Sequence, residues 1–274
     1  MSEALSPETG YVDVEGGRLY YEVAGAGPAL VLVHAGVADC RMWDEQVGAF
    51  ARHYRVIRYD TRGFGKTTSG DVAFSDRQDL ADLLSHLGID RTAVLGLSRG
   101  GQIAVDFTLE HPEMVDALVA VAAGISGYQG PATEAELQLF HEYGALSESK
   151  DAEGLIELGV RVWVDGPGQP VGRAAATVRD RVREMMASND RSHREELQPR
   201  ALEPPAVERL GEIRVPTLVV VGDLDFTGVV AAMALLGERV AGARHVVVPG
   251  TAHMVSMEQP ERFNGMVLEF LGMP

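Results

Sequence analysis

The stretch VLGLSRGGQIAVDF, residues 94–107, decides the fold of this 274-residue chain, because it joins an apolar run to a helical pattern through a cluster of glycines. Glycine weakens both strands and helices, so the cluster needs a local reason. A sharp turn at Ser98 supplies one, since it would hold Ser98 at positive φ, at a cost of about 1–3 kcal/mol. Side chains two residues to either side would then clash with the backbone, and Gly96 and Gly100 remove them. We also predict that Gly101 lets the helix pack close to the sheet.

Apolar runs and helical patterns alternate along most of the chain. Short continuous apolar runs are typical of strands buried on both faces, so the fold class is predicted to be α/β, a mostly parallel sheet with helices on both faces. Residues 11–24 alternate around Gly16-Gly17, which predicts an antiparallel lead-in hairpin. Strands are expected at 29–36, 54–60, 92–97, 114–124, 215–222 and 244–250. Helices are expected at 42–53, 76–87 with Asp76 as the candidate N-cap, 99–112, 229–240 and 259–271.

The alternation is interrupted between residues 125 and 205. This segment has no convincing strand pattern, and its periodicity predicts an all-helical insertion between two strands. We therefore expect a core domain of residues 1–124 and 206–274 and a helical cap of residues 125–205. Active sites of open α/β sheets lie beyond the carboxyl ends of the strands, so an insertion there would form a lid over the site. The three helical patterns span 132–146, 151–164 and 172–188.

Composition and charge exclude several classes of protein. Hydrophobic residues make up 46% and charged residues 23%, as in an ordinary globular domain, and no apolar run approaches the length of a membrane span. The acidic segment MSEALSPETG, residues 1–10, lacks the apolar core of a signal peptide. A single cysteine, Cys40, excludes an internal disulfide and a metal thiolate cluster and fits a reducing compartment, so we expect a cytoplasmic protein. The net charge of −16 disfavours nucleic acid as a partner.

Three motifs resemble those of the α/β-hydrolase superfamily, and the resemblance covers nearly the whole chain. Residues 96–100, Gly-Leu-Ser-Arg-Gly, look like the nucleophile elbow, and residues 34–36, His-Ala-Gly, look like the oxyanion loop, which is usually His-Gly-x. Residues 59–67 look like the D-x-R-G-x-G-x-S loop of the family, and the helical insertion lies where the family places its cap. The most similar branch contains 3-oxoadipate enol-lactonases and related small-molecule esterases, haloperoxidase-like perhydrolases and C–C bond hydrolases.

A serine nucleophile needs a histidine base and an orienting carboxylate, in the chain order Ser, acid, His for this fold. His253 follows the last expected strand, so it lies at a carboxyl end and can reach Ser98. His245 lies at the opposite end of the same strand, and His34 is expected to brace its own loop. The other histidines lie on or at the ends of presumed helices: His53, His86, His111, His141 and His193.

Two carboxylates, Asp223 and Asp225, follow the preceding strand in the segment GDLDF. Neighbouring side chains in an extended segment point in different directions, so only one can face the histidine. The resemblance favours Asp225, the third residue after the glycine, and leaves Asp223 to shape the turn. An alternative acid position in some relatives, after Gly124, is empty here, since the next carboxylate is Glu134.

The oxyanion hole needs two backbone N–H donors. Arg99 N–H lies at the helix N-terminus directly after Ser98 and provides one. The resemblance implies that Gly36 N–H is the other. Ala35, where the family usually has glycine, is a small departure in that loop.

The remaining candidates concern loop structure and the substrate pocket. Asp60 and Arg62 are expected to fix their loop rather than bind substrate, and the sequence G-F-G-K-T lacks the spacing of a phosphate-binding loop. Arg99 is expected to form a structural salt bridge, and recognition of a substrate carboxylate by its guanidinium is the alternative. Aromatic and Met side chains of this spacing more often belong to the core. Those that could line a pocket are Trp163, Phe140, Tyr143, Trp43 and Met185.

The function predicted from these residues is hydrolysis of a small carboxylic ester or lactone through an acyl-enzyme formed on Ser98. A perhydrolase or a C–C bond hydrolase would use the same three residues, and a ligand receptor with a slow or vestigial triad is an alternative of another class. Serine at this position disfavours haloalkane dehalogenases and epoxide hydrolases, which need a carboxylate there. We expect no cofactor and no metal, a small molecule as the partner, and no membrane. The sequence leaves open whether the protein forms a homo-oligomer.

Overall fold

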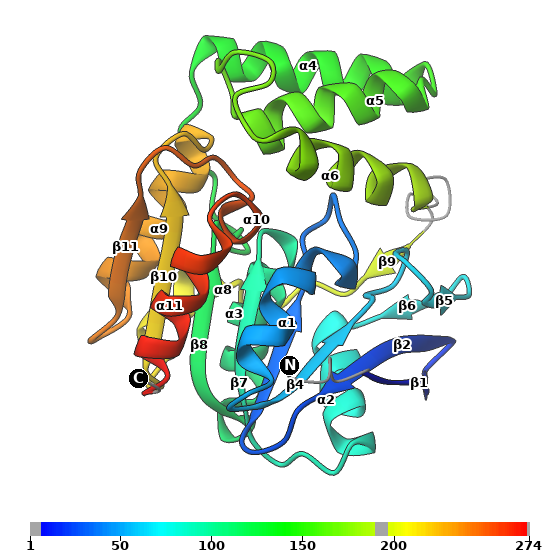
Figure 1. The fold of residues 1–274 in the computed structure, drawn as a ribbon, viewed down its shortest axis with the longest axis vertical. Helices are drawn as coiled ribbons and strands as arrows, with labels where there is room; N and C mark the ends of the chain where they lie inside the picture. Colours follow the sequence, from blue (N-terminus) through cyan, green and yellow to red (C-terminus); the bar gives the residue numbers. More distant parts are fainter. Residues whose placement is uncertain (1–6, 190–196, 273–274) are drawn as a thin grey trace, which may run out of the picture.

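A computed structural model describes residues 7–189 and 197–272. Within this part of the chain, one mixed sheet runs in the order β1-β2-β4-β3-β7-β8-β10-β11, with the short β5 paired to β2 (Figure 1). The hairpin β1–β2 is antiparallel, and β2 pairs antiparallel with β4. The strands that follow in this order, β4-β3-β7-β8-β10-β11, are all parallel to their neighbours. The predicted mostly parallel α/β sheet is confirmed.

The strands match the predicted apolar runs closely in the sheet centre. The strands are β1 Glu8–Val14, β2 Gly17–Ala24, β3 Ala29–Val33, β4 Arg55–Tyr59, β5 Thr68–Ser69, β6 Ala73–Phe74, β7 Thr92–Leu97, β8 Val115–Val121, β9 Gln198–Pro199, β10 Thr217–Gly222 and β11 Arg244–Val248. The α-helices are α1 Asp44–Phe50, α2 Asp76–His86, α3 Arg99–Glu110, α4 Glu134–Glu148, α5 Ala152–Gly159, α6 Ala176–Ser188, α8 Ala206–Arg209, α9 Thr227–Arg239, α10 Val255–Glu258 and α11 Pro260–Phe270.

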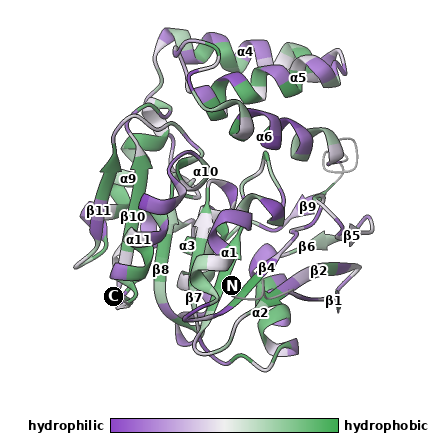
Figure 2. Ribbon diagram, in the orientation of Figure 1, coloured by the Kyte–Doolittle hydropathy of each residue, from purple (hydrophilic) through white to green (hydrophobic). Residues whose placement is uncertain are grey.

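Each central strand buries both of its faces, because successive side chains point to opposite sides of a sheet. In β3, Val31 and Val33 join a core that also contains residues of α2, α3 and α9. Leu30 and Leu32 join a second core on the other face, with residues of α1 and α11. Strands β8 and β10 are accordingly mostly hydrophobic, and drawn green, in Figure 2. The two cores hold the carboxyl ends of β3, β7, β10 and β11 at one edge of the sheet, where the candidate site lies.

The structure differs from the sequence prediction at several local points. Helix α2 is capped by Ser75, whose side chain accepts a hydrogen bond from Gln78 N–H, and not by Asp76. The helix predicted from residue 42 begins as a 3₁₀ turn at Cys40–Trp43 and continues as α1. The helical pattern at 151–164 divides into α5 and a π-helical turn, Val160–Asp165.

The insertion between β8 and β10 contains α4, α5 and α6, which lie together beyond the carboxyl edge of the sheet (Figure 1). It is not entirely helical, because the two-residue strand β9 pairs in parallel with β6. His193 lies outside the described residues, as do residues 1–6 at the start of the acidic N-terminal segment. None of the helices in the described ranges is long and apolar enough to cross a membrane.

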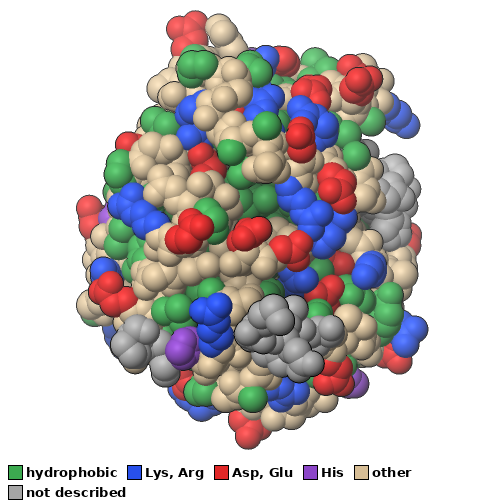
Figure 3. All heavy atoms as spheres, viewed as in Figure 1, with side chains coloured by type: hydrophobic (Ala, Val, Ile, Leu, Met, Phe, Trp, Pro, Cys, Tyr) green, Lys and Arg blue, Asp and Glu red, His purple; other side chains and the backbone are tan. Residues whose placement is uncertain are grey.

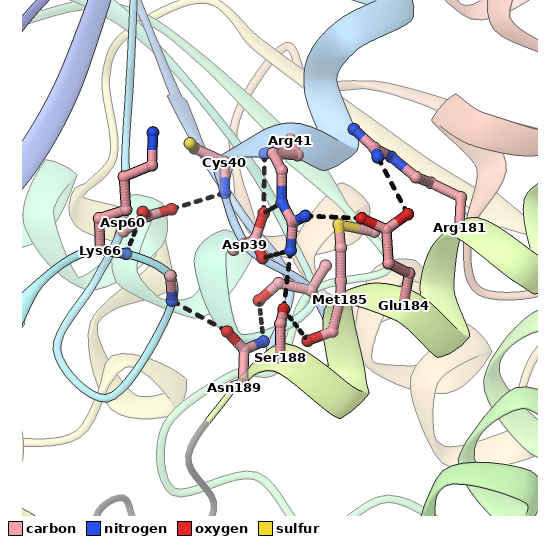
Figure 4. A network of polar contacts seen from close by, with 12 residues as sticks. Asp39, Cys40, Arg41, Asp60, Lys66, Arg181, Glu184, Met185, Ser188 and Asn189 are labelled. Atoms are coloured by element: carbon pink, nitrogen blue, oxygen red, sulfur yellow. Dashed lines mark hydrogen bonds and ion pairs between the residues drawn. The ribbon is translucent and has the colours of Figure 1, made fainter.

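A polar network joins the C-terminal half of α6 to the segment that follows β3 (Figure 4). Arg41 donates hydrogen bonds from Nη1 to Glu184 (2.8 Å) and from Nη2 to Ser188 Oγ (2.7 Å), and it forms an ion pair with Asp39. Nearby, Arg181 pairs with Asp44 and Glu184. Figure 3 shows the resulting mixture of basic and acidic side chains on the face where α6 meets the core.

Asn189 extends this network into the interior (Figure 4). Its side chain is buried, accepts a hydrogen bond from Gly65 N–H at Oδ1 (2.9 Å) and donates from Nδ2 to the Ala38 carbonyl oxygen (3.3 Å). One amide therefore ties the end of α6 to two core loops, one after β3 and one after β4.

Candidate active site

Ser98 occupies the sharp turn between β7 and α3, with φ of 58° and ψ of −118°. A Cβ added to Gly96 would lie far inside contact distance of the Gly100 carbonyl oxygen, and one added to Gly100 would do the same at the Val33 carbonyl oxygen. A Cβ on Gly101 would lie 2.5 Å from that of Ala123. The predicted positive φ and the predicted role of each glycine are confirmed.

Asp225 and His253 come from neighbouring loops after β10 and β11. His253 Nδ1 lies 2.8 Å from Asp225 Oδ2, and both side chains are buried. The other carboxylate oxygen accepts a hydrogen bond from Phe226 N–H at 2.8 Å. With its proton held at Nδ1 by the carboxylate, a neutral His253 has its accepting lone pair at Nε2.

Asp223 has a different environment. It is exposed, and its Oδ1 accepts a hydrogen bond from Gly250 N–H at 2.7 Å. Asp223 therefore joins the loop after β10 to the turn after β11, whereas Asp225 contacts the imidazole.

Ser98 and His253 line one cavity of about 290 Å³, which is at the lower end of the range for small-molecule sites. The Trp163 ring lies against the His253 ring, with centroids 4.6 Å apart. Of the described residues that line this cavity, none is Lys, Arg, Asp or Glu. Its walls are therefore uncharged apart from any charge on His253. The lining residues are Gly36, Val37, Ser98, Leu139, Phe140, Tyr143, Leu158, Val162, Trp163, Phe226 and His253.

Three of the predicted pocket residues, Trp163, Phe140 and Tyr143, line this cavity. Trp43 and Met185 do not line it: both are fully buried in the core on the α1 side of the sheet, which was the favoured interpretation of such side chains. Trp43 stacks on Phe263 with centroids 6.4 Å apart.

The Arg99 side chain is turned away from the Ser98 cavity. Its Nη2 lies 2.9 Å from both carboxylate oxygens of Asp76, and its Nη1 donates to Thr61 Oγ1 at 2.7 Å. The guanidinium therefore forms the structural salt bridge that the sequence favoured, and the alternative of Arg99 as a substrate-binding residue is corrected.

The sequence prediction missed several wall residues. Phe226 directly follows Asp225, and Val37 directly follows Gly36, so adjacency to a predicted site residue was the available signal. Leu139, Leu158 and Val162 lie on helices of the insertion, where an apolar side chain that faces a cavity has the same periodicity as one that faces the core.

His34 braces the loop that carries Gly36. It is fully buried, its Nε2 accepts a hydrogen bond from Thr61 N–H (3.0 Å), and its Nδ1 lies 2.8 Å from the Ala35 carbonyl oxygen. Burial lowers the pKa of His34, so the ring is neutral in this environment. The prediction that His34 is a bracing residue is confirmed by these contacts.

Asp60 and Arg62 also have structural partners. Asp60 accepts hydrogen bonds from Cys40 N–H and Lys66 N–H, each at 2.8 Å. Arg62 is completely buried and donates two hydrogen bonds to Asp79, at 2.7 and 2.8 Å. Both side chains fix the loop, as predicted.

Among the residues that the structure describes, one cluster has ligand atoms close enough to hold a metal ion: Asp39, Cys40 and Asp60, all buried. Arg41 already binds both oxygens of Asp39, and two backbone N–H groups bind those of Asp60. Burial raises the pKa of the Cys40 thiol, which favours the protonated form over a thiolate ligand. The cluster is thus accounted for by hydrogen bonding within the chain.

Several known proteins are similar to this chain in sequence and in fold. The sequence model described as the Alpha/beta hydrolase family matches residues 30–266. A 2-hydroxy-6-oxononadienedioate/2-hydroxy-6-oxononatrienedioate hydrolase of Burkholderia vietnamiensis is 32% identical over 276 residues, 93% of this chain and 91% of its own length. Carboxylesterase YbfK of Bacillus subtilis is 27% identical over 97% of this chain and 88% of its own length.

Among solved structures, a hydrolase from Pseudomonas aeruginosa PA01 superposes with a TM-score of 0.78 at 29% identity and covers 97% of this chain and 98% of its own. The agreement therefore extends over the sheet, the helices around it and the insertion. With a matching family model over most of its length and a relative above 30% identity, the chain belongs to the alpha/beta hydrolase family.

Proposed function

We propose that this hydrolase is a serine carboxylic ester hydrolase that cleaves an uncharged ester or lactone of a small molecule. The observation that carries the proposal is the buried contact between Asp225 and His253 beside a cavity that His253 shares with Ser98. A serine with strained backbone next to a hydrogen-bonded pair of histidine and carboxylate is typical of functional sites.

The proposed reaction follows from the roles that these groups can take. His253 Nε2 accepts the Ser98 proton as Oγ bonds to the carbonyl carbon, and the imidazolium then gives that proton to the departing alcohol oxygen. Water attacks the resulting acyl-enzyme and loses one proton to Nε2. As the bond between the acyl carbon and Ser98 Oγ breaks and the acid leaves, the imidazolium returns that proton to Ser98 Oγ. Asp225 stabilises the imidazolium throughout. The described residues contain no direct Ser98–His253 hydrogen bond, and such contacts often tighten only when substrate binds.

Two backbone N–H groups are proposed to stabilise the oxyanion. Arg99 begins α3, so its N–H lies at a helix N-terminus directly after the nucleophile. Gly36 lines the cavity together with Ser98, which supports it as the second donor. Loss of one such donor typically lowers the rate by about 10²–10³-fold.

The walls of the cavity support an uncharged substrate. A carboxylate buried against Val162, Leu158 and Phe226 would lose its hydration without gaining a cationic partner, which is costly. The Burkholderia vietnamiensis relative is named for a dioate substrate, and the absence of Lys and Arg among the described wall residues disfavours a dianionic substrate for this chain. C–C bond hydrolysis or perhydrolysis of a neutral compound would use the same Ser98, Asp225 and His253.

We further propose that residues 125–205 act as a cap that selects the substrate. Support comes from the lining of the cavity, since Leu139 and Tyr143 of α4, Leu158 of α5 and Trp163 of the π-helical turn all belong to this insertion. A small-molecule partner and a cytoplasmic location are proposed on the size of the cavity and the single cysteine, Cys40.

The test compares p-nitrophenyl butyrate with the singly charged mono-p-nitrophenyl succinate. We expect turnover of the neutral ester, much lower kcat/KM for the charged one, and loss of activity in Ser98→Ala. Ser85→Ala, on the exposed face of α2, is the control and should be fully active. Full activity in Ser98→Ala would refute the proposal. Labelling of Ser98 by a fluorophosphonate, without multiple turnover of any ester or lactone, would instead indicate a ligand receptor with a slow or vestigial triad.

A further inference from the structure

The peptide between Ala35 and Gly36 is held in place through its carbonyl oxygen. His34 Nδ1 lies 2.8 Å from the Ala35 oxygen, and His34 Nε2 accepts from Thr61 N–H, so the ring proton belongs to Nδ1 and is donated to that oxygen. The carbonyl of Ala35 and the N–H of Gly36 are parts of one planar unit. Any group that fixes this carbonyl therefore also fixes the direction of the Gly36 N–H.

The hydroxyl of Thr61 connects this imidazole to Arg99. Thr61 Oγ1 accepts a hydrogen bond from Arg99 Nη1 at 2.7 Å. The same oxygen lies 3.1 Å from His34 Nε2, so the hydroxyl proton of Thr61 can be donated to that nitrogen. The hydrogen bonds thus run in one direction, from Arg99 through Thr61 and His34 to the Ala35 carbonyl. Successive hydrogen bonds in such a series polarise one another, most strongly where water is excluded. His34 and Ala35 are fully buried, and Thr61 is 2% exposed.

Arg99 itself is anchored at its other end. Its Nη2 contacts both oxygens of Asp76, and its guanidinium lies over the Phe64 ring, 5.3 Å from the centroid. The same ring packs edge-on against His34 at 4.9 Å. The guanidinium and the imidazole therefore share one aromatic support as well as the Thr61 hydroxyl.

The stem of Arg99 also lies beside Gly36. A Cβ built on Gly36 would meet Arg99 Cβ at 3.6 Å and Cδ at 3.7 Å, which is ordinary van der Waals contact. One residue of the elbow therefore supplies a backbone N–H next to Ser98 and a side chain that reaches the loop opposite.

We propose that Asp76, Arg99 and Thr61 are positioning residues that, acting through His34, orient the Gly36 N–H toward the oxyanion. The inference rests on the proposed function, since it assumes that Gly36 N–H is an oxyanion donor. It explains why the elbow carries an arginine whose guanidinium does not enter the substrate cavity: the charge acts on the opposite donor instead.

The test replaces the carbonyl oxygen of the substrate with sulfur. Sulfur accepts hydrogen bonds poorly, so the ratio of kcat/KM for phenyl acetate to that for O-phenyl thionoacetate measures how well the donors stabilise an oxyanion. In Thr61→Val and in Arg99→Met, which keeps the backbone N–H and the stem, we expect kcat for phenyl acetate to fall about tenfold with little change in KM. The oxygen-to-sulfur ratio of kcat/KM should fall in the same two variants. Thr61→Ser, which keeps the hydroxyl, should have the kcat and the ratio of the unmodified enzyme.

Thr108→Val is the matched control. Thr108 is buried on α3, is not among the residues that line the cavity, and donates from Oγ1 to the Ala104 carbonyl oxygen of its own helix at 2.7 Å, so this change should leave the ratio unchanged. If either replacement impairs folding, Asp76→Asn at the outer end of the relay provides the same comparison. An unchanged ratio in the folded Thr61→Val, Arg99→Met or Asp76→Asn enzyme, with Ser98→Ala inactive, would overturn the positioning role alone. Full activity of Ser98→Ala would overturn the proposed function itself.

Discussion

His253 Nδ1 lies 2.8 Å from Asp225 Oδ2, while Asp223, two residues earlier in the chain, binds Gly250 N–H instead. The two carboxylates are close together in the sequence and serve different loops. We predict that Asp225→Asn lowers kcat by about 10³–10⁴-fold, because the amide stabilises neither the required tautomer nor the imidazolium. The measurement is kcat for p-nitrophenyl butyrate.

Asp223→Asn is the matched control for that experiment. The side-chain amide oxygen of this variant could still accept a hydrogen bond from Gly250 N–H, so activity should stay within a few-fold of the unmodified enzyme. Equal losses in the two variants would contradict the assignment of Asp225.

The elbow should tolerate no side chain at Gly96. A methyl group there would overlap the Gly100 carbonyl oxygen, which belongs to backbone and cannot move aside cheaply. We predict that Gly96→Ala lowers the free energy of unfolding by at least about 2 kcal/mol, measured by urea denaturation. Gly144→Ala is the control, since nothing lies within 4 Å of the added Cβ in helix α4. That change should raise stability by about 0.5–1 kcal/mol, and a similar effect of both substitutions would contradict the steric account.

Asp106 predicts a dependence of stability on pH. Burial raises the pKa of Asp106 to about 6. The hydrogen bond from Ser126 Oγ at 2.9 Å acts in the opposite direction and only partly offsets this effect. Between about pH 4 and pH 6 the folded state therefore binds more protons at this site than the unfolded state, so its contribution to stability is present at low pH and is lost as pH rises. Asp106→Asn, which is neutral throughout, should raise the free energy of unfolding by about 2–3 kcal/mol at pH 7 and by little below pH 4.

The control for Asp106 is Asp116→Asn, whose carboxylate is 53% exposed and pairs with Arg91 at the surface. It should change stability by less than about 1 kcal/mol. An increase in the free energy of unfolding of Asp106→Asn that is the same at pH 4 and at pH 7 would show that Asp106 does not titrate in this range.

Asn189 predicts how strongly the end of helix α6 is attached to the core. Asn189→Ala removes the partners of Gly65 N–H and the Ala38 carbonyl (Figure 4). We expect a loss of about 1–3 kcal/mol in the free energy of unfolding, because buried backbone groups lose their hydrogen bonds. Asn264→Ala, which removes one hydrogen bond to the Glu45 carbonyl from a half-buried side chain, should cost less. An equal cost would contradict the role of burial.

The parts of the site that could be predicted from the sequence are those that local rules determine. The glycines around Ser98 mark a turn that only small residues permit, and Asp225 and His253 follow strands whose carboxyl ends must meet at one edge. Residue type and place relative to an element were sufficient for Ser98 and His253, whereas the choice of Asp225 over Asp223 also needed the resemblance to the α/β-hydrolase superfamily.

The partners of Arg99 could not be predicted, because its contacts to Asp76 and Thr61 span 23 and 38 positions in the chain. The error at the start of α2 has the same origin. Ser75 and Asp76 are both good N-caps, and Ser75 takes that role while the Asp76 carboxylate binds Arg99. A long-range ion pair decided between two locally equivalent choices.

The wall of the cavity was the least predictable part. Trp43 and Trp163 both lie in helical patterns, yet Trp43 packs in the core and Trp163 lies against His253. Periodicity identifies the buried face of a helix and does not distinguish burial against a neighbouring element from burial against a cavity.

The central claim is that Ser98 becomes acylated, and the most direct measurement is peptide mass mapping after rapid acid quench of the protein during turnover of p-nitrophenyl acetate. The account predicts one acetyl group per chain on the peptide that contains Ser98, and none in the Ser98→Ala protein. An acetyl group on another residue during turnover, or turnover with no acylated species under conditions that trap the fluorophosphonate adduct of Ser98, would contradict it.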